Sequence, residues 1–326
     1  MDRPAHTATW RKRSDEPVAT LWGPIREGMA DMGPILTVLL PATLGIVMLG
    51  LGLALTTADF ARVVTAPRAV VVSLGCQLVV LPLLCFGMVE LAGVPPVFAV
   101  GMMILVASPG GTMANLFSHL ARGDVALNVT LTAINSVLAV VTLPIVVGLS
   151  MNHFLADDAN IGLQTDKLVQ VFAVVLVPVV VGMWVNRVFP AFSRRMRGPV
   201  KKTSVVVLVV MLVGTVVQNR ETIFSNMGTI GGVALALTVL SFTIGYWAPR
   251  LAGVGREQSI ASAMEIGVHN AVLAMTVAAS VFDSLEMVIP AAVYGTIMFV
   301  PAGLAAFYFA RRTAPAATRT ADVARV

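Results

Sequence analysis

Charged residues are scarce in this sequence. Only 12% of its 326 residues are Asp, Glu, Lys or Arg, whereas 57% are hydrophobic and the mean hydropathy is +0.87. A soluble domain has roughly 25% charged and about 45–50% apolar residues, and several apolar runs here exceed the ~18 residues that mark a spanning helix. The composition excludes a large soluble protein and predicts an all-α integral membrane protein.

Cysteine is almost absent. The two cysteines, Cys76 and Cys85, lie in one apolar run and form neither a Cys-x-x-Cys motif nor a zinc-ligand spacing. We therefore interpret both as buried, reduced thiols with a structural role.

Acidic residues are missing from the apolar runs, with one exception. Glu265 is the only Asp or Glu well inside a predicted span, and a carboxylate at the bilayer centre costs about 2.5–3.5 kcal/mol on insertion scales. It must be neutralised by a proton, a basic side chain or a bound cation. No Lys or Arg lies at that depth in any predicted span, so a proton or a metal ion remains.

Nine apolar runs are expected to cross the membrane as helices within residues 35–310. Residues 1–34 are expected to form a tail with a short interfacial helix at 18–32, and residues 311–326 a C-terminal tail. The nine predicted spans are 35–56, 69–92, 97–121, 125–150, 168–189, 204–219, 228–248, 257–282 and 287–310.

Basic residues predict the orientation. The net charge of +5 would suggest a nucleic-acid partner in a soluble protein, but here Lys and Arg lie in loops beside apolar runs, so we expect no nucleic-acid partner. One set of alternate loops holds most of them, and the other holds only Lys167 and Arg220. The positive-inside rule then predicts a cytoplasmic C-terminus and an external N-terminus. No targeting segment is evident, which favours a multi-pass protein of a bacterial inner (plasma) membrane.

Two predicted spans are interrupted by polar residues and helix breakers, at 108–115 (Ser-Pro-Gly-Gly-Thr-Met-Ala-Asn) and at 265–270 (Glu-Ile-Gly-Val-His-Asn). Pro109 removes a backbone donor, and two glycines with weak helix preference follow it. Carbonyls freed before Pro109 can bind a cation, and the helix that restarts at Thr112 can bind an anion. A simple proline kink would explain the first stretch alone. Interrupted segments in both halves instead favour a secondary transporter's binding site.

Oxygen-bearing side chains are predicted at the depth of Glu265, and hard cations such as Na⁺ prefer oxygen ligands. Asn128, Thr132 and Asn135 recur at spacings that place them on one helix face. His269 could orient a neighbour, titrate near neutral pH or contact substrate. No second His or Cys lies nearby at its depth, so no transition-metal site is expected. The candidate ligands are Gln77, Asn115, Asn128, Thr132, Asn135 and Asn270.

Three motifs together resemble the bile acid:sodium symporter family, including its bacterial members. They are the stretch at 108–115, the run Leu-Ala-Arg-Gly-Asp-Val-Ala-Leu at 120–127, and the stretch at 265–270. The resemblance covers about residues 35–310. It implies two inverted repeats, at about 35–150 and 168–310, that form a core domain and a panel domain. Two broken helices would cross in the core, with two sodium ions behind the crossing.

The resemblance also implies roles for individual residues. The first sodium site would use Asn115, Asn128, Thr132 and Glu265; the second would use Gln77, Glu265, His269 and the backbone of Ile266 and Val268; substrate would contact Gly111, Thr112, His269 and Asn270.

The chain departs from the family pattern at three points. Many bacterial members have ten helices, and this chain lacks apolar sequence for the first. Ala114 stands where a serine is common, which removes one possible ligand of the first sodium site. His269 replaces the usual glutamine, and an imidazole nitrogen is a poor sodium ligand. One sodium ion could therefore be replaced by a proton.

These features predict a sodium-coupled symporter that imports an organic anion by alternating access, with one or two Na⁺ ions. The anion could be bile acid-like, pantoate-like or another carboxylate or sulfonate. The alternative is a proton-coupled carrier that uses Glu265 and His269. An intramembrane enzyme is a remote alternative, because no Asp lies in a predicted span and no His-Glu-x-x-His motif occurs. A channel would require a polar line along several helices, whereas the polar residues cluster at one depth.

Overall fold

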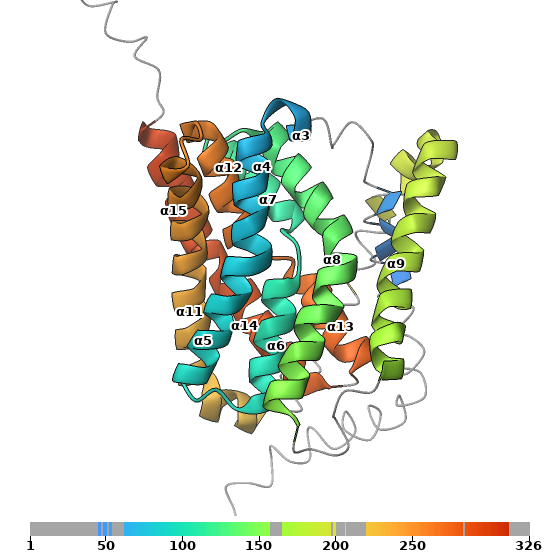
Figure 1. Cartoon of the computed structure of the whole chain (residues 1–326), viewed down its shortest axis with the longest axis vertical. Coiled ribbons are helices and arrows are strands. Elements are labelled where there is room, and N and C mark those ends of the chain that lie inside the picture. Colours follow the sequence, from blue (N-terminus) through green and yellow to red (C-terminus); the bar gives the residue numbers. More distant parts are fainter. Residues whose placement is uncertain are drawn as a thin grey trace, which may run out of the picture.

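A computed structural model describes residues 62–156, 165–196, 220–282 and 284–312, together with a few residues between 45 and 53 and at 198–199 and 206. Its regular structure is helical, which confirms the all-α class (Figure 1). The expected N-terminal tail and interfacial helix lie outside the described residues, as do most of the predicted spans at 35–56 and 204–219. The helices in chain order are α3 (Arg62–Thr65), α4 (Pro67–Gly75), the π-helix η2 (Cys76–Val80), α5 (Leu81–Leu91), α6 (Pro96–Ala107), α7 (Thr112–Leu120), α8 (Val125–Phe154), α9 (Thr165–Val188), α11 (Arg220–Leu251), α12 (Arg256–Gly267), α13 (Ala271–Val281), α14 (Leu285–Ile297) and α15 (Phe299–Arg312).

Four helical stretches are long and apolar enough to cross a bilayer. They are Pro67–Leu91, Val125–Phe154, Met227–Leu251 and Glu286–Arg312. These stretches confirm an integral membrane architecture, because each has the length and composition of a spanning segment.

The two interrupted spans are each built from a pair of half-helices. In the first, α6 ends at Ala107 and α7 restarts at Thr112. In the second, α12 ends at Gly267 and α13 restarts at Ala271. The two broken helices cross each other: α7 packs against α12, and α6 packs against α13 (Figure 1). Neither half-helix alone is long enough to cross a bilayer, so the polar residues at each break lie within the bundle.

The span at 67–91 contains a feature that the sequence pattern did not predict. Its middle turn, Cys76–Val80, is a π-helix. Pro82 follows and lacks the N–H that would bond to the carbonyl four residues earlier, which accounts for the wider turn. Gln77 lies in this turn, and its side chain is buried. Such π-bulges frequently occur at functional sites.

Several predicted boundaries were wrong by a few residues. The apolar stretch Met227–Leu251 agrees with the span expected at 228–248, but its helix α11 begins earlier, so Arg220 lies in a helix rather than in a loop. The last span is divided at Met298 into α14 and α15, since Pro301 cannot donate to the carbonyl of Ile297. Arg311 and Arg312 belong to α15 rather than to the C-terminal tail.

Helix α9 stands at one edge of the molecule, beside the described residues near position 50, while α11 and α15 lie at the opposite edge (Figure 1). The contact between α9 and the earlier segment is very close. A Cβ added to Gly182 would lie 2.9 Å from the Cα of Gly52 and 2.8 Å from the nitrogen of Leu53. Small residues permit such close helix contact in membranes.

Candidate functional site

The two helix breaks meet and bond to each other through their backbones. Gly110 and His269 form an isolated antiparallel bridge. Gly111 donates its N–H to the Val268 carbonyl at 3.0 Å, and Asn270 donates to the Pro109 carbonyl at 2.9 Å. Backbone groups inside a bilayer must be satisfied within the protein. Each break therefore supplies partners that the other needs.

The side chain of Glu265 lies at this crossing and is 2% exposed. Its Oε1 accepts a hydrogen bond from the Gly110 N–H at 3.1 Å, and its Oε2 lies 2.5 Å from the Thr132 hydroxyl. No salt bridge joins it to another described residue. A Cβ at position 110 would collide with the Glu265 carboxyl group. Glycine is thus required where this carboxyl group approaches the backbone.

The Thr132 hydroxyl faces two oxygen acceptors. Besides Glu265 Oε2, it lies 3.0 Å from the Asn128 carbonyl. A hydroxyl has a single proton to donate. Both contacts are satisfied if the carboxyl group carries a proton, and a bound cation could take that proton's place. The geometry therefore fits either a proton on Glu265 or a cation beside it.

Three amide oxygens around the crossing are buried without a hydrogen-bond donor among the described residues. Asn128 Nδ2 donates to the Ala261 carbonyl at 2.8 Å, which leaves its Oδ1 unpaired. Gln77 Nε2 lies 3.4 Å from the Ser108 carbonyl, which leaves its Oε1 unpaired. Asn115 Oδ1 is likewise unpaired. Buried acceptors without donors are costly, and a hard cation is one ligand that such oxygens prefer.

Asn135 is buried one turn beyond Thr132 on α8. Both polar atoms of its side-chain amide lack partners among the described residues. It shares a helix face with Asn128 and Thr132, as its spacing predicted, and it stays a candidate.

His269 lies on the other side of the crossing. Its Nδ1 is 3.4 Å from both the Ser108 carbonyl and Gln77 Nε2, and its Nε2 is buried with no partner among the described residues. The imidazole thus lies beside the side-chain amide nitrogen of Gln77. A nitrogen ligand here is ill-suited to Na⁺. Within the described ranges, no three His, Cys, Asp or Glu side chains gather as a metal cluster.

Two helix N-termini begin at the crossing. Helix α7 starts at Thr112 after Gly111, which makes no side-chain capping bond, whereas Asn270 caps α13 by accepting from the Leu273 N–H at 3.0 Å. The predicted substrate contacts Gly111, Thr112, His269 and Asn270 are therefore adjacent in the backbone. The cap uses the side-chain carbonyl oxygen of Asn270.

Sequence reasoning missed residues that support the second break. The Tyr294 hydroxyl donates to the Gly267 carbonyl at 3.1 Å, and its ring lies 5.4 Å from that of His269. The Ser73 hydroxyl donates to that of Ser262 at 2.7 Å. The sequence did offer one signal: Tyr294 lies inside the apolar run predicted to span at 287–310, and the hydroxyl of a buried tyrosine usually requires a hydrogen-bond partner.

Comparison with known proteins identifies the family of this chain. A family model described as the Sodium Bile acid symporter family matches residues 41–226. This match contains the first break and ends before the second. It covers more than half of the chain.

Curated relatives carry names of sodium-dependent transporters rather than enzymes. The chain is 29% identical over 250 residues to the probable sodium/metabolite cotransporter BASS1 of Arabidopsis thaliana, covering 77% of this chain and 61% of that protein. It is 27% identical to the sodium-dependent transporter YocS of Bacillus subtilis, covering 82% of each. It is 25% identical to the human ileal sodium/bile acid cotransporter, covering 78% of this chain and 72% of that protein. The chain therefore belongs to the Sodium Bile acid symporter family, a family of sodium-dependent membrane transporters.

Proposed function

We propose that this protein is a secondary active symporter that couples inward movement of sodium to import of a small organic anion. The observation that supports it best is the crossing itself. A single buried carboxyl group, a hydroxyl and unpaired amide oxygens surround two helix breaks. Paired broken helices of this kind form the binding sites of secondary transporters.

The cation site would use Glu265, Thr132, Asn128 and Asn115. Sodium beside Glu265 would neutralise the carboxylate and relieve the competition for the Thr132 proton. It would also give the unpaired oxygens of Asn115 and Asn128 a ligand. The second site implied by family resemblance would use Gln77, Glu265, His269 and the backbone of Ile266 and Val268. We propose that His269 weakens that second site, because it lies beside Gln77 and the Val268 carbonyl already accepts from Gly111.

The anion would bind on the side where α7 and α13 begin. Helix N-termini favour negative charge, and Gly111, Thr112, His269 and Asn270 lie there. Coupling follows if the anion binds well only to the sodium-loaded arrangement of the two breaks. The anion class includes bile acid-like, pantoate-like and other carboxylates or sulfonates; bile acid is the one anion that the relatives' names mention.

Alternating access would move two bodies against each other. We propose a core domain that contains the crossing, and a panel domain that contains α9 and the glycine-packed segment near Gly52. The basic ends of the helices would face the cytoplasm of a plasma membrane. Two inverted repeats, at about 35–150 and 168–310, would account for the antiparallel crossing of the two broken helices.

The test is thermal stability of the purified protein titrated with Na⁺, K⁺ or Li⁺. A ligand at 100 times its dissociation constant adds about 2.7 kcal/mol of stability. We expect the unfolding midpoint to rise with Na⁺, and the rise to disappear in Glu265→Gln. Glu90→Gln is the matched control, since the Glu90 side chain is exposed and its carboxylate lies 3.4 Å from His153 Nε2, away from the crossing residues. A Glu265→Gln variant that still responds fully to Na⁺ would overturn the site assignment.

A proton-coupled carrier is the second candidate, and the 2.5 Å contact between Thr132 and Glu265 favours it. Uptake of a labelled organic anion into proteoliposomes separates the two. Uptake driven by a sodium gradient without a pH gradient supports the symporter proposed here. Uptake driven only by a pH gradient excludes sodium coupling and supports the proton-coupled carrier.

A further inference from the structure

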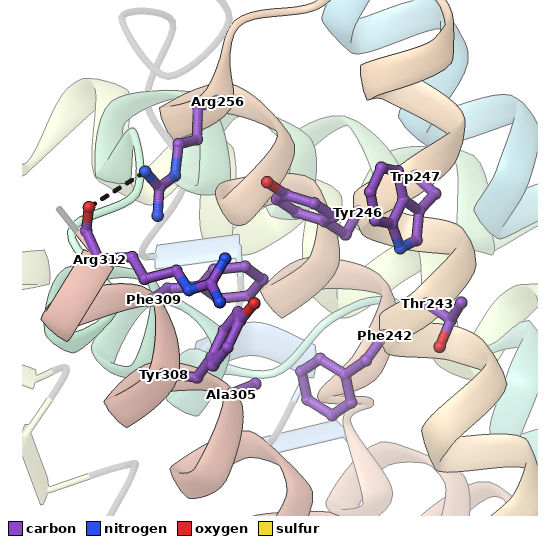
Figure 2. Close-up of a pocket in the computed structure, with 9 residues that line it drawn as sticks. All are labelled: Phe242, Thr243, Tyr246, Trp247, Arg256, Ala305, Tyr308, Phe309 and Arg312. Carbon is purple, nitrogen blue, oxygen red and sulfur yellow. Dashed lines mark hydrogen bonds between the residues drawn. The ribbon is translucent and has the colours of Figure 1, made fainter.

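A cavity of about 440 Å³ lies at one end of the bundle, and Phe242, one of its lining residues, packs against Gly267 of the second break. It is a half-open cavity lined by the last turns of α11, the first turn of α12 and the last turns of α15 (Figure 2). None of the crossing residues lines it. Helices α11 and α15, which line it, lie at the edge of the molecule opposite α9 (Figure 1). A ligand held between these helices would lie beside the surrounding membrane.

The cavity has a positive wall. Arg256 and Arg312 are the charged residues among the 9 that line it, and no carboxylate is present. Arg256 Nη1 donates to the Arg312 carbonyl at 3.2 Å, and Arg256 Nε is buried without a partner among the described residues. Figure 2 shows both guanidinium groups bordering the same space. Guanidinium groups bind phosphate through paired hydrogen bonds, so this wall suits a phosphate group.

The remaining wall is aromatic and typical of the membrane–water interface. Tyr246, Trp247 and Tyr308 line the cavity, and Trp247 is 56% exposed. The Arg312 guanidinium lies 4.7 Å from the centre of the Tyr308 ring. Trp and Tyr collect at the level of lipid headgroups, and Arg256 begins α12 while Arg312 ends α15. The cavity therefore lies at headgroup depth.

We propose that this cavity binds the phosphate headgroup of an anionic phospholipid, whose acyl chains lie against the exposed apolar surfaces of α11 and α15. Exposed side chains such as Leu240, Leu304 and Phe307 continue these surfaces away from the cavity. Basic pockets between spanning helices bind anionic headgroups in this way. The three helices supply two positive charges and aromatic contacts. A zwitterionic headgroup has no net negative charge, so it should bind the two arginines more weakly.

The test measures lipid retention by the full-length protein. Delipidated protein is mixed with phosphatidylglycerol or phosphatidylcholine, and bound lipid is counted by native mass spectrometry. We expect tighter retention of phosphatidylglycerol, weakened about fivefold by each of Arg256→Gln and Arg312→Gln. Arg311→Gln is the matched control, because Arg311 is adjacent and exposed but lies over the Phe307 ring at 3.9 Å, outside the cavity. The control should retain phosphatidylglycerol like the wild type.

A second measurement uses the unaltered cavity. With Trp10, Trp22 and Trp184 changed to Phe, Trp247 is the remaining tryptophan. Its fluorescence should be quenched at lower concentration by brominated phosphatidylglycerol than by brominated phosphatidylcholine. Equal quenching by both lipids, or equal loss of retention in Arg311→Gln, would refute the site. Full competition by glycerol phosphate at the same concentration would show an anion site that does not depend on lipid chains, and would also refute it.

Discussion

The backbone N–H of Gly110 donates to Glu265 Oε1 at 3.1 Å across 155 residues of sequence. This single bond ties the first helix break to the only carboxyl group buried at the second among the described residues. The contact is possible because position 110 has no side chain. A change at either residue should therefore alter both breaks.

We expect Gly110→Ala to abolish sodium-dependent stabilisation and to lower the free energy of unfolding by about 1–3 kcal/mol, the usual cost of overpacking. The added methyl would displace the Glu265 carboxyl group. Thermal midpoints with and without Na⁺ provide the measurement. The control is Gly232→Ala in α11, where a Cβ meets nothing within 4 Å. A Gly110→Ala protein with an unchanged sodium response would show that this close approach is not needed.

We expect Thr132→Val to weaken sodium binding about tenfold, since the hydroxyl contributes one ligand and one hydrogen bond of about 1.4 kcal/mol. Thr130→Val is the control two positions away, because the Thr130 hydroxyl donates to the Ala126 carbonyl of its own helix. Sodium titration of the unfolding midpoint compares the two. Equal weakening in both variants would indicate a general effect on α8.

We expect Tyr294→Phe to cost about 1–3 kcal/mol of stability, the usual penalty for a buried acceptor left unpaired. The acceptor is the Gly267 carbonyl at the second break. Thr296→Val on the same helix is the control, because its hydroxyl is exposed and bonds only within α14. Chemical or thermal unfolding provides the comparison. No loss of stability in Tyr294→Phe would mean that the break is supported elsewhere.

We expect His269→Gln to increase the number of sodium ions bound. A glutamine supplies an amide oxygen beside Gln77 in place of a nitrogen, and oxygen suits Na⁺ better. The Hill coefficient for sodium-driven uptake should rise from about one towards two. A coefficient near two in the wild type would show that the second site functions with histidine present.

The location of both breaks was predictable, because proline, glycine and a lone carboxylate stand out in apolar sequence. The π-helix at Gln77 could not be located with confidence from Pro82 alone, since a proline in a span more often gives a simple kink. The backbone pairing of Gly111 with Val268 joins segments far apart in the chain, and the local sequence pattern does not predict such a long-range contact. The sequence also defined the helix ends poorly, because a helix can extend beyond its apolar run. Helix α11, for example, begins at Arg220, before the apolar stretch that starts at Met227.

The mutual bonding of the two breaks has a consequence for biogenesis. The ribosome completes Pro109 and Gly111 long before it makes Val268 and Asn270, so the first broken helix enters the membrane with backbone groups that await partners. Each unsatisfied group in hydrocarbon costs several kcal/mol. The first half of the chain should therefore be a substrate for membrane chaperones and proteases until the second half arrives. Separately expressed halves should survive only when they are made in the same cell.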